Sequence, residues 1–385
     1  MGKISNLAYK LWFQAQLGAP PFIQNLIISP LVELKEIFRI IKNPFFDIYR
    51  IQDQNQAGSL TATYFTTKEI RASRQFRGIF FTENLSITPI GRVPIWNIHK
   101  EITSVDSDII MVETDKRLVN RLPYQKAIVI PLQVLLQIDV RGSWDDVKKR
   151  FHKTVSHTEL RLTQKHGYTY HLSHDPQEFE HFYYQMYLPT MEDRHGDLNL
   201  PLAKEDLAAY LKHGFLFLIK KGEQVVAGGL CYPQQKTLTL LVGGLLNADE
   251  ELRRQGAMGA MRSLLIQWAN QAGFETFNFG DSGPFLAGGI FQYKRKWGAK
   301  VVARNRRIWL KVQRNNPAVC QLLKDHPIIT VDKKGDLHGL IIVNNSREID
   351  TSDEVELQRK YATPGLNSLL IRSMADLVVE PIRAA

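Results

Sequence analysis

The segment from Leu238 to Lys300 constrains the fold most, because strand and helix patterns follow one another in it in a fixed order. The apolar run Leu238–Gly244 predicts a strand, and Gly256–Ala272 predicts a helix that opens on a glycine. A second strand is predicted at Phe274–Phe279, and a basic aromatic stretch follows at Phe291–Gly298. This alternation predicts an α/β or α+β fold in which a mixed sheet is flanked by helices.

The glycine-opened helix is a predicted seat for a phosphorylated ligand. The first N–H groups of a helix have no partner inside it, and the helix dipole is positive at this end. Neither a G-x-x-x-x-G-K-[ST] loop nor a G-x-G-x-x-G turn directly after a strand is present, which argues against P-loop and dinucleotide-binding proteins. We therefore expect backbone groups to hold the phosphates. The expected contact residues are Arg254, Gln255, Gly256, Ala257 and Gly259.

Composition is that of an ordinary globular protein, with 44% hydrophobic and 23% charged residues. Lys and Arg outnumber Asp and Glu by 49 to 39, and this favours either acidic partners or simply a basic surface. The two cysteines, Cys231 and Cys320, form no C-x-x-C pair, and the histidines lack metal-site spacing. We therefore expect no disulfide framework and no metal, and a reducing cytoplasm fits best.

The first 57 residues predict an amphipathic helical segment. Leu31, Leu34, Phe38 and Ile41 recur at helical spacing beside several cations. Such a helix can lie on an anionic membrane surface, or it can pack on the protein's own core or on a partner protomer. No secretory signal pattern is present, and the longest apolar run, Pro20–Val32, is too short to span a bilayer. We expect a cytoplasmic protein, with peripheral membrane contact as one alternative.

Further elements can be placed along the chain. Short β-rich pieces between residues 58 and 131 predict part of a sheet. Ser143 is a credible N-cap for a strongly basic helix that runs to about His166. Phe215–Lys220 and Gln224–Tyr232 predict a hairpin, which completes a β-β-β-α-β core with the segment described above.

The chain after residue 312 is predicted to be a C-terminal extension. Two short strands are expected at Ile328–Val331 and Leu337–Val343, and a last amphipathic helix near Leu366–Leu377. We expect this extension to serve docking or dimerisation, so a homodimer is among the expected states.

Four segments in order resemble a known family. Phe277–Ser282 and Phe291–Ala299 are similar to the F-x-F-G … Y/F-K-x-x-[FW]-G ending of FemAB-like acyltransferases, which belong to the GNAT superfamily. The basic stretch Lys149–Gly167 and the segment Tyr187–Gly196 are similar to two further parts of that family. The resemblance covers about residues 100–312.

The resemblance implies a GNAT-like mixed sheet, with two GNAT-like halves in tandem. Two residues depart from the family pattern: Asn278 stands where Asp is more common, and Met258 stands where the signature Q/R-x-x-G-x-G/A has Gly or Ala. The implied division is an N-terminal segment at 1–57, a first half at 58–200, a second half with the donor site at 201–312, and the extension at 313–385.

The resemblance implies direct transfer of an acyl group from a thioester donor, such as acyl-CoA, to an amine. The amine must lose a proton and the carbonyl must be polarised, but no covalent nucleophile is needed. Gly243 and Gly244 permit close approach, so backbone N–H groups there can polarise the carbonyl; alternatively, these glycines simply turn the chain. Acyl-CoA is then a co-substrate, and no bound cofactor is expected.

Three candidate catalytic residues follow the second predicted strand. By the resemblance, Lys294 can neutralise a carrier phosphate or carboxylate and Tyr293 can protonate the leaving group, unless the basic stretch is only a solvated face. Asp281 can act as a general base or bind an ammonium group, unless it only forms a turn.

A further set of candidates lies in the segment Tyr187–Gly196. His195 can act as a base, Arg194 can bind an anion bidentately, and Glu192 belongs to the same expected substrate-binding segment. The alternative is that the two cations only interact with a helix C-terminus.

Three functions stay open. The first is a thioester-dependent N-acyltransferase that acts on a small-molecule or cell-envelope amine. The second uses aminoacyl-tRNA as donor; relatives of that kind typically add a long helical-hairpin arm, and no such charged heptad segment is present. Apart from tRNA, no nucleic-acid partner is expected of an enzyme. The third is a non-catalytic module that binds lipid or nucleic acid through its basic helix and N-terminal segment.

Overall fold

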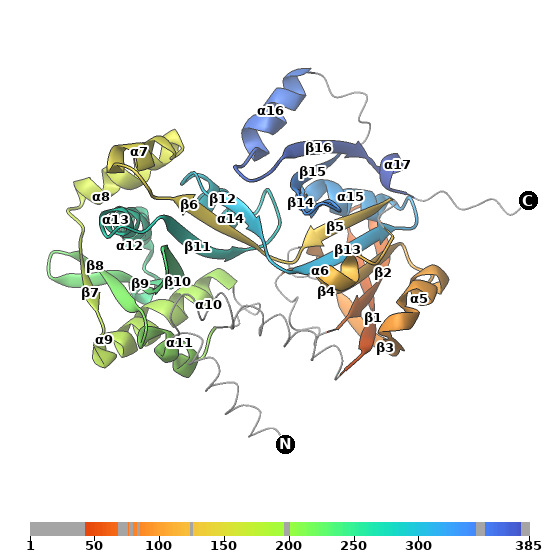
Figure 1. Cartoon of the computed structure of the whole chain (residues 1–385), viewed down its shortest axis with the longest axis horizontal. Helices are drawn as coiled ribbons and strands as arrows, with labels where there is room; N and C mark the ends of the chain where they lie inside the picture. Colours follow the sequence, from red (N-terminus) through yellow and green to blue (C-terminus); the bar gives the residue numbers. More distant parts are fainter. Residues whose placement is uncertain are drawn as a thin grey trace, which may run out of the picture. The chain divides into compact units, whose positions relative to one another are not determined.

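The computed structural model describes residues 43–67, 76, 80–82, 85–123, 126–195, 201–343 and 351–378, and only the backbone of Arg194, His195 and Thr351. The contacts divide these residues into two units. The first comprises residues 136–280 and 296–299, and the second comprises the remaining described residues. Figure 1 labels the α-helices and β-strands of both. The helix predicted around residues 31–42 lies outside the described residues.

The first unit is built on a mixed sheet in which the strands follow the order β6-β11-β10-β9-β8-β7. Strands β7 to β10 pair antiparallel with their neighbours, whereas β10 and β11 run parallel. Strands β8 and β9 form continuous buried runs, at residues 215–219 and 226–232, so both faces of the sheet are covered there, whereas β6 alternates between buried and half-buried residues. The strands are β6 (Val134–Asp139), β7 (Thr169–Ser173), β8 (Phe215–Lys221), β9 (Gln224–Gln234), β10 (Thr237–Leu245) and β11 (Thr276–Ser282).

Helix α13 is the central helix of the first unit, because it packs against β8, β9 and β10. Two segments wind as π-helices, η4 against α13 and η5 against β10, and such windings are uncommon and frequent at functional sites. The helical segments are α7 (Trp144–Lys149), η4 (Val155–Leu160), α8 (Arg161–Lys165), α9 (Pro176–His181), η5 (Phe182–Tyr187), α10 (Leu188–His195), α11 (Lys204–Leu211), η7 (Leu246–Ala248), α12 (Glu250–Arg254) and α13 (Ala257–Gln271).

The second unit contains one sheet of order β3-β1-β2-β4-β13-β5 and a smaller sheet of order β14-β15-β16. In the larger sheet only β2 and β4 run parallel. The strands are β1 (Phe45–Asn55), β2 (Gly58–Thr66), β3 (Ser86–Pro94), β4 (Ile109–Asp115), β5 (Ala127–Pro131), β12 (Lys300–Ala303), β13 (Arg306–Val312), β14 (Ile328–Val331), β15 (Leu337–Val343) and β16 (Ser368–Ser373). The helical segments are η3 (Ile95–Asn97), α5 (Ile98–Ser104), α6 (Lys116–Val119), α14 (Gly289–Arg295), α15 (Pro317–Asp325), α16 (Thr351–Tyr361) and α17 (Met374–Leu377).

The mixed α/β fold predicted from the sequence is confirmed. Each larger sheet contains a parallel pair, β10 with β11 and β2 with β4, beside antiparallel strands. The arrangement of two GNAT-like halves in tandem stays a prediction. The two contact units have boundaries other than the predicted ones at residues 57, 200 and 312. The four-part functional division stays a prediction. In the described part of the chain, no helix is long and apolar enough to cross a membrane.

Two predicted helices differ in the structure. Ser143 caps α7 as expected, but the basic helix breaks after Lys149, where the N–H of His152 donates to the carbonyl oxygen of Lys296 at 2.7 Å. The helix predicted near Leu366–Leu377 is wrong, because Ser368–Ser373 pairs as a parallel strand with β15. A neighbouring strand edge outweighed the helical spacing of the apolar residues there.

Candidate active site

Strand β10 parts from β11 and carries a bulge just beyond that point. Its pairing with β9 shifts between Leu240 and Val242, which leaves Leu241 as an extra residue. On its other side it pairs with β11 only from Thr237 to Thr239. Among the described residues, β10 therefore has no ladder with β11 from Leu240 onward. A bulge next to an unpaired strand edge presents backbone N–H and C=O groups to a ligand.

The side chain of Asn278 lies at the point where the two strands part. It is 8% exposed, its Oδ1 accepts from the N–H of Gly280 at 3.0 Å, and its Nδ2 donates to Oγ1 of Thr239 at 3.4 Å. Gly280 has a φ of +77°, which favours glycine. The amide of Asn278 thus joins β11 to β10 without placing a charge there, unlike the Asp of the family pattern.

Gly243 and Gly244 lie near the end of β10, opposite Gly229 and Gly228 of β9. A Cβ on Gly244 would overlap the backbone of Met186 in η5. Close approach of two backbones thus accounts for glycine at residue 244. The role of this pair in polarising a carbonyl stays a prediction.

The first turn of α13 is covered by η4 and α8. Gly256 has a φ of +82°, and a Cβ there would lie 3.0 Å from Cδ1 of Leu162. A Cβ on Gly259 would overlap Oε2 of Glu159. Ala257 is fully buried. These contacts account for small residues at this turn by packing, and phosphate binding there stays a prediction.

Glu159 places a carboxylate against the turn where phosphate binding is predicted. Burial raises the pKa of Glu159, and the nearby cations of Arg262 and Lys296 oppose that shift. A phosphate bound at the first turn of α13 would meet this carboxylate, because its Oε2 lies against Gly259. Glu159 was not among the residues that the sequence singled out.

The polar residues just before this turn are held by neighbours. Arg254 pairs with Glu251 at 2.9 Å. Oε1 of Gln255 accepts from Nζ of Lys221 at 2.6 Å, and its Nε2 donates to Oε1 of Glu251 at 2.8 Å. If Arg254 or Gln255 bound a ligand, the ligand would have to replace these contacts.

Asp281, Lys294 and Arg304 form a cluster in the second unit, which we call the Asp281 cluster. The guanidinium of Arg304 contacts both carboxylate oxygens of Asp281, at 2.8 and 3.2 Å. Nζ of Lys294 donates to the backbone carbonyl oxygen of Asp281 at 2.7 Å. Tyr293 is half-buried on the same helix, α14. The structure thus brings Asp281 and Lys294 together, and it adds Arg304, which the sequence did not indicate.

Two aromatic residues of the family pattern, Phe279 and Trp297, form part of the core of the first unit. Trp297 is fully buried. Its ring lies 5.3 Å from that of Phe151 and 6.3 Å from that of Phe279. Packing therefore accounts for Phe279 and Trp297, whereas Lys294 lies in the Asp281 cluster.

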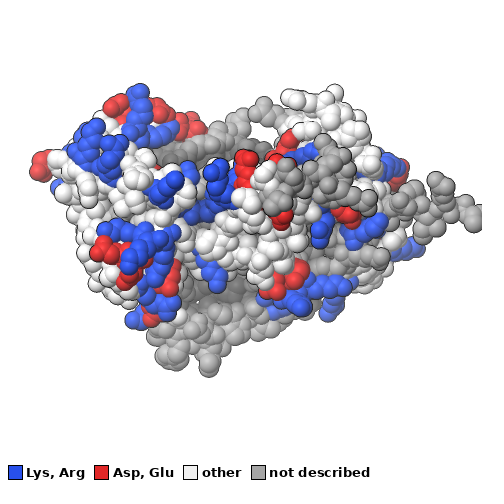
Figure 2. Space-filling view, turned by 90° about the horizontal axis from the view of Figure 1, so that it is seen from above, with Lys and Arg blue, Asp and Glu red and all other residues white. Residues whose placement is uncertain are grey.

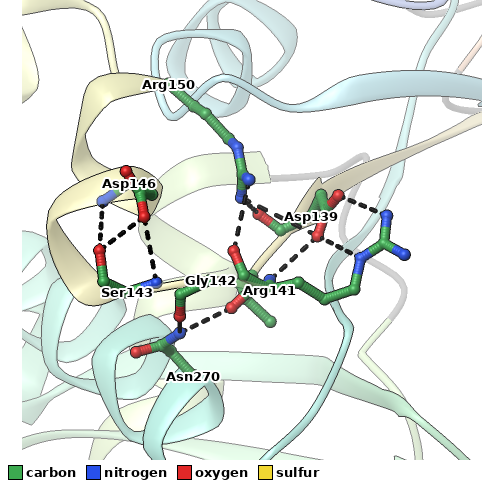
Figure 3. A network of polar contacts seen from close by, with 8 residues as sticks. Asp139, Arg141, Gly142, Ser143, Asp146, Arg150 and Asn270 are labelled. Carbon is green, nitrogen blue, oxygen red and sulfur yellow. Dashed lines mark hydrogen bonds and ion pairs between the residues drawn. The ribbon is translucent and has the colours of Figure 1, made fainter.

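A polar network fixes the turn between β6 and α7, as Figure 3 shows. Arg141 contacts both carboxylate oxygens of Asp139, at 3.0 and 2.7 Å, and Nδ2 of Asn270 donates to the carbonyl oxygens of Val140 and Gly142. The hydrogen bond from Arg141 is the main reason why the pKa of Asp139 falls to about 2. This network positions the start of the basic segment.

The basic segment is partly neutralised. Lys148 pairs with Asp145 at 2.7 Å, and Lys149 pairs with Asp146 at 2.8 Å. On the face of the molecule in Figure 2, Asp and Glu side chains likewise lie among the Lys and Arg side chains. The segment is therefore not a surface of one sign.

The remaining predicted residues lie on α10. Glu192 is exposed, and the neighbouring Asp193 pairs with Arg253 at 2.6 Å. The side chains of Arg194 and His195 lie outside the described part of the chain, so their roles stay predictions.

Residues 149–295 match the family model described as "Acetyltransferase (GNAT) domain". A comparison with curated proteins gives no match. The crystal structure of FemX is similar at a TM-score of 0.41 and 13% identity, over 83% of this chain and 98% of that one. L-PGS from Bacillus licheniformis is similar at a TM-score of 0.35 and 13% identity, over 71% of this chain and 87% of that one. A GCN5-related N-acetyltransferase from Sphaerobacter thermophilus is similar at a TM-score of 0.32 and 11% identity, over 65% of this chain and 72% of that one.

The activity of this chain is therefore inferred from the family match alone. It spans η4, η5, the bulged strand β10, α13 and β11, and it ends at Arg295 in α14. Residues 149–295 thus match a GNAT acetyltransferase domain, and the chain is an acyltransferase.

Proposed function

We propose that this enzyme forms an amide bond by direct transfer of an acyl group from an acyl-thioester carrier, such as acyl-CoA, to an amine. The observation that carries the proposal is the parting of β10 and β11 beyond Thr239 and Asn278, next to the bulge at Leu241. Backbone N–H groups at such an edge are fixed donors. Fixed donors stabilise a carbonyl oxygen that gains negative charge during attack by an amine.

In this reaction the amine nitrogen attacks the carbonyl carbon, the carbon–sulfur bond breaks, and the sulfur leaves with the electron pair. We assign Asp281 as the base that accepts the proton lost by the ammonium group. Tyr293 is the acid that donates a proton to the leaving sulfur. Lys294 balances negative charge on the carrier. Its contact with the carbonyl oxygen of Asp281 holds its ammonium group at the end of β11.

The donor and the acceptor are the finer parts of the proposal. An acyl thioester and an aminoacyl-tRNA ester both present an activated carbonyl, and we favour the thioester because the sequence offers no helical-hairpin arm. The acceptor is a small-molecule or cell-envelope amine. The GNAT match favours an enzyme over a non-catalytic module.

Native mass spectrometry with a panel of acyl-CoAs and free CoA tests the donor, and thiol release in the presence of a panel of amines tests turnover. Lys294→Ala is expected to lower kcat/KM by about 100-fold, the size of a lost proton-transfer or charge-balancing group. The matched control is Lys300→Ala, an exposed cation close in the chain, which is expected to leave kcat/KM within about twofold.

Thermal unfolding of both variants separates lost activity from lost folding. An unchanged rate in Lys294→Ala would remove this residue from the mechanism. Absence of any CoA adduct, together with acyl transfer from aminoacyl-tRNA, would replace the thioester by the alternative donor.

A further inference from the structure

A cavity of about 290 Å³ lies in the second unit, where β1, β4, η3, α5 and α6 meet. Its walls are mainly apolar, and they include the side chains of Phe46, Ile98, Leu118 and Leu122. Three of these are almost fully buried in the folded chain. The volume is close to the lower limit for small-molecule sites, which begin at about 300 Å³. The cavity therefore suits one small apolar group and is too small for a folded partner.

The rim of this cavity carries an exposed aromatic side chain. Trp96, on η3, is 67% exposed although its indole is large and mostly apolar. Its ring lies 6.5 Å from that of Phe45, so one neighbour supports its position. Aromatic side chains of this kind usually gain contacts when a ligand binds, because they combine apolar area with little conformational freedom.

The cavity also has a guanidinium and an imidazole beside its apolar walls. Arg121 and His99 both line it, and both are exposed. Arg92, Arg304 and Arg314 of the same unit pair with the carboxylates of Asp47, Asp281 and Asp106. No described carboxylate pairs with Arg121. Its guanidinium is thus available to an outside anion, and it can bind a carboxylate or a phosphate with two parallel hydrogen bonds.

We propose that this cavity binds a small molecule with an anionic head group on a short apolar body. The apolar body lies among Phe46, Ile98, Leu118 and Leu122, the indole of Trp96 covers it, and Arg121 holds the anionic head. This inference does not depend on the proposed acyl transfer, because the cavity contains none of the residues assigned to that reaction.

Isothermal titration calorimetry of the whole chain with octanoate, below its critical micelle concentration, tests the proposal. Octanoate is expected to bind at one site, and octanol, which has the same body without the charge, is expected to bind at least about tenfold more weakly. Octyl phosphate distinguishes a phosphate head from a carboxylate head, and tighter binding of either anion supports an anion site. Equal binding of octanol and the anions would overturn the proposal, as would no binding of either anion.

Two variants locate the site. Arg121→Gln is expected to weaken octanoate binding about tenfold, whereas the matched control Lys100→Gln, an exposed cation on α5 outside the cavity, is expected to leave it unchanged. Leu118→Trp fills the cavity and is expected to abolish binding. In the chain with natural Trp96, octanoate should shift tryptophan fluorescence to shorter wavelength, and Trp96→Phe should remove that shift. Octanoate binding that survives Leu118→Trp in a folded protein would place the ligand elsewhere.

Discussion

At the scale of single residues, packing accounts for three glycines that the sequence assigned to donor binding. Gly244 admits the backbone of η5, Gly256 provides a positive φ beside Leu162, and Gly259 admits the carboxylate of Glu159. A loss of activity on substitution of these glycines would therefore not by itself indicate a ligand contact. Side chains whose removal leaves the packing intact, such as Lys294, are better tests of chemistry.

The contact between Glu159 and Gly259 leads to a prediction about stability. Gly259→Ala is expected to lower the free energy of unfolding by about 1–3 kcal/mol, because the added methyl group overlaps the carboxylate. In a Glu159→Ala background the same change is expected to be neutral, or to stabilise by up to about 1 kcal/mol, since Ala is favoured over Gly in a helix. Urea unfolding of the four proteins gives the coupling energy.

Gly256→Ala is the matched comparison, because its positive φ disfavours Ala whether or not Glu159 is present. It should destabilise both backgrounds. If Gly259→Ala had the same effect in both backgrounds, the two residues would not be in contact.

At the scale of elements, the turn between β6 and α7 makes stability depend on pH. The pKa of Asp139 falls from an ordinary 3.8 to about 2 in the folded chain, mainly through the hydrogen bond from Arg141. A group with a lowered folded-state pKa contributes stability that is fully present above its unfolded value and is lost as pH falls through the folded value. Asp139→Asn should therefore shift the urea midpoint downward at pH 7, and this difference should vanish between about pH 4 and pH 2.

Glu356 is exposed on α16, and Glu356→Gln is the control for a general effect of lost acidic charge. It is expected to leave the urea midpoint unchanged at neutral pH. A difference between wild type and Asp139→Asn that stays constant down to pH 2 would show that the carboxylate charge does not stabilise the turn.

The sequence predicted elements well where local pattern and neighbours agree. The hairpin of β8 and β9 has two strongly apolar runs joined through Gly222, so its turn and its buried faces were both visible in the sequence. The basic helix was predicted as continuous, because nothing in its own residues shows that Lys296 accepts a hydrogen bond from His152. Ser368–Ser373 was predicted as helix for the same reason, since its partner β15 is distant in the chain.

In the candidate site, too, the residues in linear motifs could be predicted, and the residues joined only by long-range contacts could not. Asp281 and Lys294 could be named because they belong to linear motifs, and the structure places them in contact. Arg304 and Glu159 could not be named. Their importance comes from contacts with Asp281 and Gly259, which the fold brings together from separate parts of the sequence.

At the scale of the whole molecule, the two units interleave along the chain. Residues 281–295 belong to the second unit, although the segments on both sides of them, 136–280 and 296–299, belong to the first. Contacts that stabilise the first unit therefore join distant parts of the sequence, such as Phe151 with Trp297. A division of the chain at one residue cannot separate the two units.

This arrangement predicts how fragments of the chain behave. Residues 201–312, the predicted second half, do not include Glu159 and Leu162, which pack on α13. They also lack Phe151, which packs on Trp297, so much of the core of this fragment would be open to water. This fragment is expected to unfold without a cooperative transition in circular dichroism, whereas residues 134–299 retain these contacts and are expected to unfold cooperatively. If 201–312 melted cooperatively, the sequence-based boundary at residue 200 would be a domain boundary after all. If 134–299 failed to do so, the first unit would depend on the second for its stability.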